Sequence, residues 1–285
     1  MTPKVKIVTD STAYLLPETI SRYDIRVVPL KIIFGTEVYS EGVNITNDEF
    51  YRRLVKSRTL PITSQSSVSD FVKVYSELVS LGHPIFSIHI SGKLSGTINS
   101  ALVAREAFPE AQIEVVDWLS MGMGLLVRVA ARVAEEGHDL LAVKAIIEQL
   151  APRVSIFAML DTLKYLWKGG RIGGAKASVG SLLSIKPIVA LENGEVKPLA
   201  KVRSQAKGVE YMLKLMEKRV GQGASIHGAV VHSHSFDEAL ALHREVGVRF
   251  NCVELDLVEL GPVFGTHIGP GVLGLAFYSD EQCSL

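Results

Sequence analysis

Strand–helix alternation in the first half of the chain restricts the fold more than any other feature. Apolar, strand-like runs are interspersed there with segments of helical spacing, at residues 5–9, 47–55, 69–81, 84–90, 97–108, 113–116 and 120–150. Because the connections are short, this pattern predicts an α/β domain over residues 1–150 with a mostly parallel sheet. One further apolar run, Ile25–Phe34, predicts a strand whose hairpin return is Gly35–Tyr39.

The pattern changes near Ala151, where predicted strands follow one another more closely. Asn193-Gly194 stands between the apolar runs 185–191 and 196–201 and predicts a β-hairpin. Further helices and strands are expected at 204–220, 226–232, 236–249, 252–260 and 272–278. We therefore expect residues 151–285 to form a second, α+β domain with a mixed or antiparallel sheet. No low-complexity linker separates the two domains, so a ligand cleft between them is expected.

Composition excludes several classes of function. Lys plus Arg equals Asp plus Glu, at 30 each, so the chain has no net attraction for nucleic acid or an anionic membrane. Its two cysteines are far apart in sequence, which favours a reducing compartment over a disulfide scaffold. No signal segment opens the chain, and no apolar run reaches the roughly 20 residues that span a bilayer. A cytoplasmic protein without an integral membrane segment is expected.

Two polar loops are candidates for binding an anion. Ser91–Thr97 follows a predicted strand and precedes a predicted helix, so it should lie at the carboxyl edge of the sheet, where ligands bind. Its Lys93 does not complete a phosphate-binding P-loop, because the required glycine spacing is missing and Leu94 follows the lysine. Thr63–Ser67 contains more hydroxyls than capping the next helix requires.

Glycine and proline are dense in a third segment, Gly261–Gly271. Their density predicts a tight loop between two strands, with Thr266 and His267 at its centre. Such a loop either holds a compact polar or anionic headgroup or serves only as a structural turn.

Basic and histidine-containing motifs are weaker indications of a binding site. Arg171 lies among four glycines in 168–174, and this arrangement fits a helix C-cap, an anion contact or a docking surface. Arg203 belongs to a second basic group, with Lys201 and Lys207. His232-Ser233-His234 has no third ligand at a telling spacing, so no metal site is expected. No nucleophile elbow or paired carboxylate is visible, so no catalytic residues are assigned.

Seven motifs occur in order along the whole chain: Val8–Thr12, Thr63–Gln65, Leu94–Thr97, Lys168–Ile172, Ile185–Ile188, Lys201–Arg203 and Gly261–Gly274. Together they resemble the DegV family of bacterial fatty-acid-binding proteins, of the type that serves as the lipid-binding subunit of a fatty acid kinase. Two departures stand out. Gly92 and Lys93 replace a Ser-Gly pair, and Ser66 stands where a proline is common.

The resemblance implies a two-domain, non-enzymatic lipid-binding protein with no cofactor, whose ligand is a long-chain fatty acid such as palmitate or oleate. It implies an apolar tunnel between the domains and a carboxylate held by Thr63 and Ser95. Thr97, Thr266 and His267 are implied nearby, with weaker contributions from Ser64, Lys93 and Gly96. The apolar, Met-containing stretch 119–126 either lines the tail of the ligand or forms plain helix core. A separate ATP-dependent kinase would form the acyl phosphate used in phospholipid synthesis, and Arg171 and Arg203 would contact this partner or the phosphate.

Two alternatives remain open at this point. A dihydroxyacetone-kinase-like enzyme has a related fold and would need a histidine for covalent attachment of its substrate, for which His89 and His267 are the candidates. A regulatory, purely protein-binding module would show an exposed apolar patch and no enclosed cavity.

Overall fold

Four parallel strands form the first sheet of the molecule. The computed structural model describes residues 3–118, 121–178, 185–192, 194–221 and 223–280. The sheet has the order β2-β1-β6-β7, with β1 at Lys6–Asp10, β2 at Arg26–Val28, β6 at Ile85–Ile90 and β7 at Ile113–Trp118. Every pairing within it is parallel, as the strand–helix alternation predicts.

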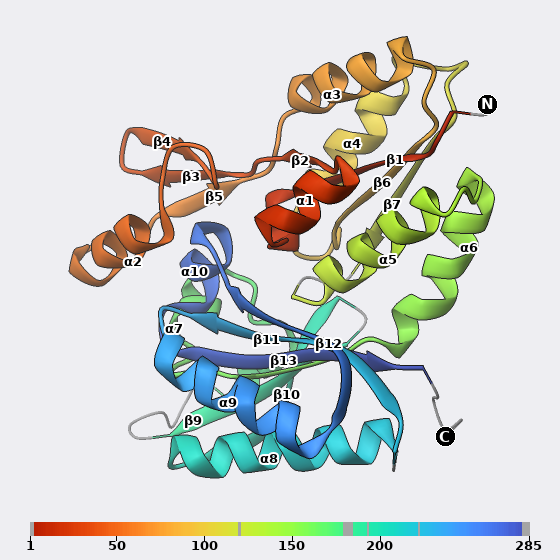
Figure 1. The fold of residues 1–285 in the computed structure, drawn as a ribbon. Coiled ribbons are helices and arrows are strands. Elements are labelled where there is room, and N and C mark those ends of the chain that lie inside the picture. Colours follow the sequence, from red (N-terminus) through yellow and green to blue (C-terminus); the bar gives the residue numbers. More distant parts are fainter. Residues whose placement is uncertain (1–2, 119–120, 179–184, 193, 222, 281–285) are drawn as a thin grey trace.

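Helices cover both faces of this sheet (Figure 1). On one face α3 (Val68–Ser80) and α4 (Thr97–Arg105) pack against the strands. On the other lie α5 (Met123–Glu135) and α6 (Leu140–Leu150). Ser67 and Asp70 form a capping box at the start of α3, so part of the Thr63–Ser67 hydroxyl cluster has a structural role. The short α1 begins at Pro17 and ends at Tyr23.

A six-stranded mixed sheet makes up the second half of the chain. Its order is β10-β9-β8-β13-β11-β12, and β11 and β12 are its one described parallel pair. The strands are β8 (Ser155–Met159), β9 (Lys186–Glu192), β10 (Glu195–Val202), β11 (Ser225–Ser233), β12 (Asn251–Glu259) and β13 (Val272–Ser279). The hairpin predicted at Asn193-Gly194 joins β9 and β10, although Asn193 itself lies outside the described residues.

Two long helices cover one face of the mixed sheet, at the bottom of Figure 1. These are α8 (Gln205–Val220) and α9 (Phe236–Arg249). The opposite face joins the core that also contains α5 and the first sheet. The last strand of the parallel sheet ends at Trp118, and the first strand of the mixed sheet begins at Ser155. The predicted domain boundary at residue 150 falls between them and remains a prediction.

A third, antiparallel sheet corrects one prediction. Ile25–Phe34 is not one strand, because Pro29 lacks an N–H and the run divides around it. Arg26–Val28 joins the parallel sheet as β2, and Lys31–Phe34 forms β3 of a small sheet with the order β4-β3-β5. In that sheet β4 is Glu37–Ser40 and β5 is Ile62–Ser64, and the adjacent helix α2 spans Asn47–Lys56.

A helix corrects the prediction for Gly261–Gly271, which is not wholly a loop. Pro262–Ile268 forms the helix α10, which begins at the proline and is followed by Gly269, whose φ is 74°. Proline suits the first turn of a helix, and glycine without a Cβ tolerates the positive φ found just after the last turn. The helix contacts α2, β3 and β5 of the first half and α7 (Lys164–Lys168) of the second.

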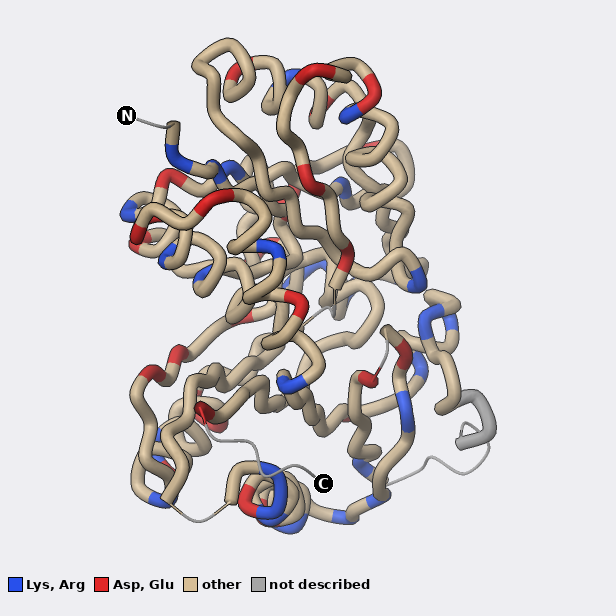
Figure 2. Tube along the Cα trace, turned by 90° about the vertical axis from the view of Figure 1, so that its right-hand side faces the viewer, with Lys and Arg blue, Asp and Glu red and all other residues tan. Residues whose placement is uncertain are grey.

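Short 3₁₀ turns complete the described elements, at Ser11–Ala13, Ala151–Arg153 and Gly173–Ser178. Basic and acidic residues intermingle over both halves of the chain in Figure 2, in keeping with the balanced composition. No helix in the described part of the chain is long and apolar enough to cross a membrane.

Candidate functional site

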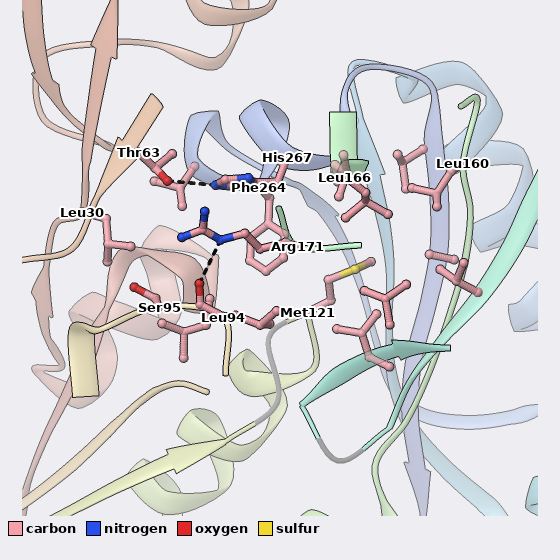
Figure 3. A pocket seen from close by; sticks show the side chains of 18 of the residues that line it. Leu30, Thr63, Leu94, Ser95, Met121, Leu160, Leu166, Arg171, Phe264 and His267 are labelled. Carbon is pink, nitrogen blue, oxygen red and sulfur yellow. Dashed lines mark hydrogen bonds between the residues drawn. The ribbon is translucent and has the colours of Figure 1, made fainter. Parts of the chain in front are cut away.

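A cavity of about 300 Å³ lies where α10 and the loops of the first half meet the mixed sheet. Polar side chains gather at one end, and apolar side chains line the remainder (Figure 3). The polar residues are Thr63, Ser64, Gln65, Ser95, Arg171 and His267. The apolar wall includes Met121, Ala158, Leu160, Leu166, Val189, Leu191, Val196 and Val272. A cavity with an apolar wall and a polar end favours a small-molecule-binding protein over the protein-binding-module alternative.

Thr63 and His267 meet at the polar end although they are 204 positions apart in sequence. The Thr63 hydroxyl lies 2.8 Å from Nε2 of His267. Nδ1 of His267 is buried and has no hydrogen-bond partner among the described residues. A buried N–H without an acceptor is costly, so we assign the proton to Nε2, which donates to Thr63. The Thr63 hydroxyl is then free to donate its own proton into the cavity.

The environment of His267 favours its neutral form. Burial, reinforced by the nearby Arg171 guanidinium, lowers the pKa of His267 to about 4. Nδ1 packs against Gly169, where any side chain would overlap the imidazole. The ring therefore serves as a neutral donor near pH 7 and adds no charge to the cavity.

Ser95 lines the cavity from the loop that follows β6, next to the start of α4. Its hydroxyl lies 2.9 Å from that of Thr97, and it accepts a hydrogen bond from the Thr97 backbone N–H at 3.3 Å. Thr97 itself is fully buried and is not among the residues that line the cavity. Thr97 therefore supports the Ser95 hydroxyl from behind, on the far side from a ligand.

Gln65 is a lining residue that the sequence-based assignment missed. Its Nε2 donates to Ser100 at 2.9 Å, which ties β5 to α4. A Cβ on Gly96 would lie only 2.0 Å from the Gln65 amide oxygen, so Gly96 permits a close approach of the two segments. The Thr63–Gln65 motif contained this signal, because the glutamine directly follows two candidate hydroxyls.

Arg171 brings positive charge to the polar end. Its Nε donates to the Leu94 carbonyl at 3.2 Å (Figure 3). One Nη donates to the Gly169 carbonyl at 2.8 Å. Both acceptors are neutral, so the guanidinium charge is not cancelled by them. The side chain is exposed to solvent and also lines the cavity, which puts it at an opening. The glycines around it form the predicted helix end, with Gly170 at a φ of 71°.

Besides Thr97, three predicted site residues are not part of the cavity lining. The Thr266 hydroxyl donates to the Pro262 carbonyl within α10 at 2.9 Å. Lys93 forms an ion pair with Glu195 at 3.4 Å and lines a neighbouring groove. Arg203 is exposed just before α8 and lines none of the described pockets. Of the weaker candidates, Ser64 and Gly96 do line the cavity.

A buried acid anchors the start of α10. Glu41 is 5% exposed and accepts hydrogen bonds from the Ser11 hydroxyl at 2.6 Å, the Tyr14 hydroxyl at 3.0 Å and the Val263 N–H at 2.7 Å. Tyr14 in turn accepts from the Phe264 N–H at 3.1 Å. Burial raises the pKa of Glu41 to about 7. The helix that carries His267 is thus fastened to the first half of the chain.

His89 belongs to a closed hydrogen-bond chain rather than to a site. Its Nδ1 lies 3.1 Å from Asp10 and its Nε2 2.7 Å from Ser87, which also accepts from Tyr75. His89 is fully buried, and none of the described cavities includes it. With both ring nitrogens engaged it cannot attach a substrate, which argues against the kinase-like alternative at this residue.

No group of three or more His, Cys, Asp or Glu side chains suited to a metal ion occurs among the described residues. His232 and His234, at the end of β11, are therefore not part of such a group among the described residues. Met121 of the predicted tail-lining segment reaches the cavity, whereas Leu119 and Ser120 lie outside the described residues.

Comparison with known proteins gives a consistent result over nearly the whole chain. The sequence model described as "Uncharacterised protein, DegV family" matches residues 4–280. A DegV domain-containing protein of Halalkalibacterium halodurans is 35% identical, over 98% of this chain and 99% of its own.

Solved structures share the fold. A DegV family protein of Thermus thermophilus, described by its fatty acid binding, superposes with a TM-score of 0.92 at 36% identity and covers 97% of this chain and 99% of its own. A stearic-acid-binding protein of Eubacterium ventriosum superposes with a TM-score of 0.89 at 30% identity, over 96% of this chain and 98% of its own.

Proposed function

The chain belongs to the DegV family, and we propose that it binds one long-chain fatty acid, such as palmitate or oleate, without itself catalysing a reaction. The observation that carries the proposal is the division of the cavity into a small polar end and a long apolar wall. An aliphatic carboxylic acid is divided in the same way, into a small polar carboxylate and a long apolar chain. Similar structures described as fatty acid binding proteins support this choice of ligand.

Burial of the acyl chain supplies most of the binding energy. Each methylene removed from water contributes about 0.8 kcal/mol, so a sixteen-carbon chain contributes on the order of 10 kcal/mol before entropic costs. The carboxylate must be hydrogen-bonded, because a buried charge without partners is prohibitively costly. In the proposed complex the hydroxyls of Thr63 and Ser95 donate to it, and Arg171 supplies a compensating charge.

We further propose that the bound acid is presented to a separate ATP-dependent kinase, which phosphorylates its carboxylate for use in phospholipid synthesis. Arg171 supports this proposal because it lies at an opening of the cavity beside the polar end. Arg203, exposed before α8, is a second candidate for contact with the kinase. Because the partner consumes ATP, the proposal assigns the carrier to the cytoplasm.

Mass spectrometry of the purified, denatured protein tests the proposal directly. We expect about one fatty acid per chain, and we expect delipidated protein to take up added palmitate or oleate. A Val189→Asp variant is the control, since a carboxylate in the apolar wall should abolish uptake. Absence of both co-purified acid and uptake by the folded wild-type protein would refute the proposal.

Replacing Ser95 by alanine should weaken carboxylate binding by about 1–3 kcal/mol, or roughly 5- to 150-fold in Kd, because a bond to a charged group is lost. Ser80→Ala is the matched control, since Ser80 is exposed at the end of α3 and its hydroxyl bonds the Glu77 carbonyl. Competition with a fluorescent fatty acid measures both. Equal affinity of the Ser95 variant and wild type would remove Ser95 from the headgroup site.

A further inference from the structure

The end of α7 adjoins two side chains of the polar end of the cavity, His267 and Arg171. A Cβ on Gly169 would lie 2.4 Å from Nδ1 of His267 and 3.2 Å from its Cε1, so the imidazole packs directly on the glycine backbone. The Gly169 carbonyl accepts a hydrogen bond from the Arg171 guanidinium at 2.8 Å. Gly169 therefore contacts both side chains, although it is not among the residues that line the cavity.

Two neighbouring glycines follow α7 for different reasons. Gly170 has a φ of 71°, and a Cβ there would meet nothing within 4 Å, so this glycine is needed for its backbone conformation. Its N–H donates to the Trp167 carbonyl and the Arg171 N–H donates to the Leu166 carbonyl, which together form a Schellman motif. Gly169 has a φ of −80° and a ψ of −5°, a right-handed conformation that is open to alanine. Gly169 is therefore needed for the space that it leaves.

The imidazole of His267 fills this space and is held in it by packing. Its Nε2 meets the Thr63 hydroxyl at 2.8 Å (Figure 3). Nδ1, the atom nearest to Gly169, has no hydrogen-bond partner among the described residues. The ring thus lies between Thr63 on one side and the Gly169 backbone on the other. A methyl group at 169 would displace the ring, and at 2.8 Å from the hydroxyl the ring has no room to move toward Thr63.

Displacement of the ring would reach a bound carboxylate through Thr63. While Nε2–H donates to the Thr63 oxygen, the hydroxyl directs its own proton into the cavity. Without that donor the hydroxyl is free to rotate, and its proton no longer has one preferred direction. The hydrogen bond that Thr63 donates to a carboxylate is then weakened.

We propose that Gly169 is a positioning residue for the fatty acid carboxylate. The space that it leaves seats His267 against Thr63, and this contact orients the Thr63 hydroxyl toward the ligand. The inference rests on the proposed fatty-acid binding, and it adds a residue that acts on the headgroup without touching it.

A double-mutant cycle between positions 169 and 267 tests this inference, with palmitate affinity measured by competition with a fluorescent fatty acid. Gly169→Ala should weaken palmitate binding roughly tenfold, because a hydrogen bond to a charged group is weakened. His267→Ala should weaken it by a similar factor. In the double variant the methyl group occupies space that the imidazole has left, so its affinity should match that of His267→Ala within about twofold.

Gly247→Ala is the matched control. Gly247 lies in α9, on the face of the mixed sheet away from the cavity, and a Cβ there would meet nothing within 4 Å. The same methyl group should leave palmitate affinity unchanged at this position. Alanine also retains the carbonyl at 169, so Gly169→Ala preserves the hydrogen bond to Arg171.

A purely structural role for Gly169 gives a different result in the cycle. If the methyl group only loosened the end of α7, it would lower affinity in the His267→Ala background as well, and the two losses would multiply. That result overturns the inference. Wild-type affinity in either Gly169→Ala or His267→Ala also overturns it.

The outcomes separate this inference from the function on which it rests. Wild-type protein that binds no palmitate overturns the proposed function and the inference with it. If Gly169→Ala does not fold, circular dichroism of the double variant decides the matter. A folded double variant with the affinity of His267→Ala supports the overlap with the imidazole, whereas an unfolded one beside a folded His267→Ala overturns it.

Discussion

An Asp10→Ala variant is expected to lose about 3–5 kcal/mol of its free energy of unfolding. The Asp10 carboxylate is fully buried at the end of β1 and accepts hydrogen bonds from the Thr12 N–H and hydroxyl and from the Ile90 N–H. It also holds Nδ1 of His89. Alanine would leave these buried groups without a partner. The loss is large, because the whole free energy of unfolding of a folded protein is only about 5–15 kcal/mol.

Urea denaturation followed by circular dichroism measures this loss. Asp237→Ala is a matched control, because Asp237 is exposed in the first turn of α9 and should change the free energy by less than about 1 kcal/mol. Because Ile90 leads directly into the loop that carries Ser95, the Asp10 variant should also bind fatty acid less well. A destabilisation no larger than that of the control would show that the buried network is dispensable.

A Glu41→Gln variant should change how stability depends on pH. Burial raises the pKa of Glu41 from its ordinary value of 4.5 to about 7. The folded protein therefore retains a proton that the unfolded chain releases, and this contribution to stability is present below pH 4.5 and lost as the pH rises through 7. Glutamine is neutral throughout, so the variant should gain about 3 kcal/mol relative to wild type between pH 4.5 and about pH 8.

The titration of His267 changes the free energy of unfolding with pH in the opposite direction to that of Glu41. In the Glu41→Gln variant the contribution of His267 is no longer offset and should become measurable. Its pKa is lowered from 6.5 to about 4, so its contribution to stability is present above pH 6.5 and lost as the pH falls through 4. In the wild-type protein the two groups offset each other over much of this range. Free energies of unfolding across the range, with the exposed Glu110→Gln as control, measure the difference. Parallel profiles for wild type and Glu41→Gln would contradict the assignment.

Much of the fold could be predicted because it depends on local patterns. The helical spacing of 69–81 and the capping residues Ser67 and Asp70 place α3, and Pro17 marks the first residue of α1. The two sheets follow from the change between strand–helix alternation and close strand succession. Ile25–Phe34 was mispredicted because an apolar run alone does not reveal which of two sheets its halves join.

The site was less predictable because its geometry is set by contacts between distant segments. Thr63, Ser95 and His267 were identified through a family resemblance, and the structure brings all three to one cavity. Thr266 is adjacent to His267 in sequence, but the helical rotation of α10 turns its hydroxyl to the Pro262 carbonyl. The apolar run 185–191 predicts a strand that ends at Leu191, but the place of Leu191 in the cavity wall depends on the pairing of β9 with β8 and β10.

The central place of β13 in the mixed sheet has a consequence for synthesis of the chain. This last strand lies between β8 and β11, so the hairpin β9-β10 with β8 and the pair β11-β12 remain separate until it is available. His267, which completes the polar end of the cavity, leaves the ribosome 204 residues after Thr63. The parallel first sheet can form on a nascent chain, whereas the mixed sheet and the ligand cavity can close only after His267 and β13 have been synthesised.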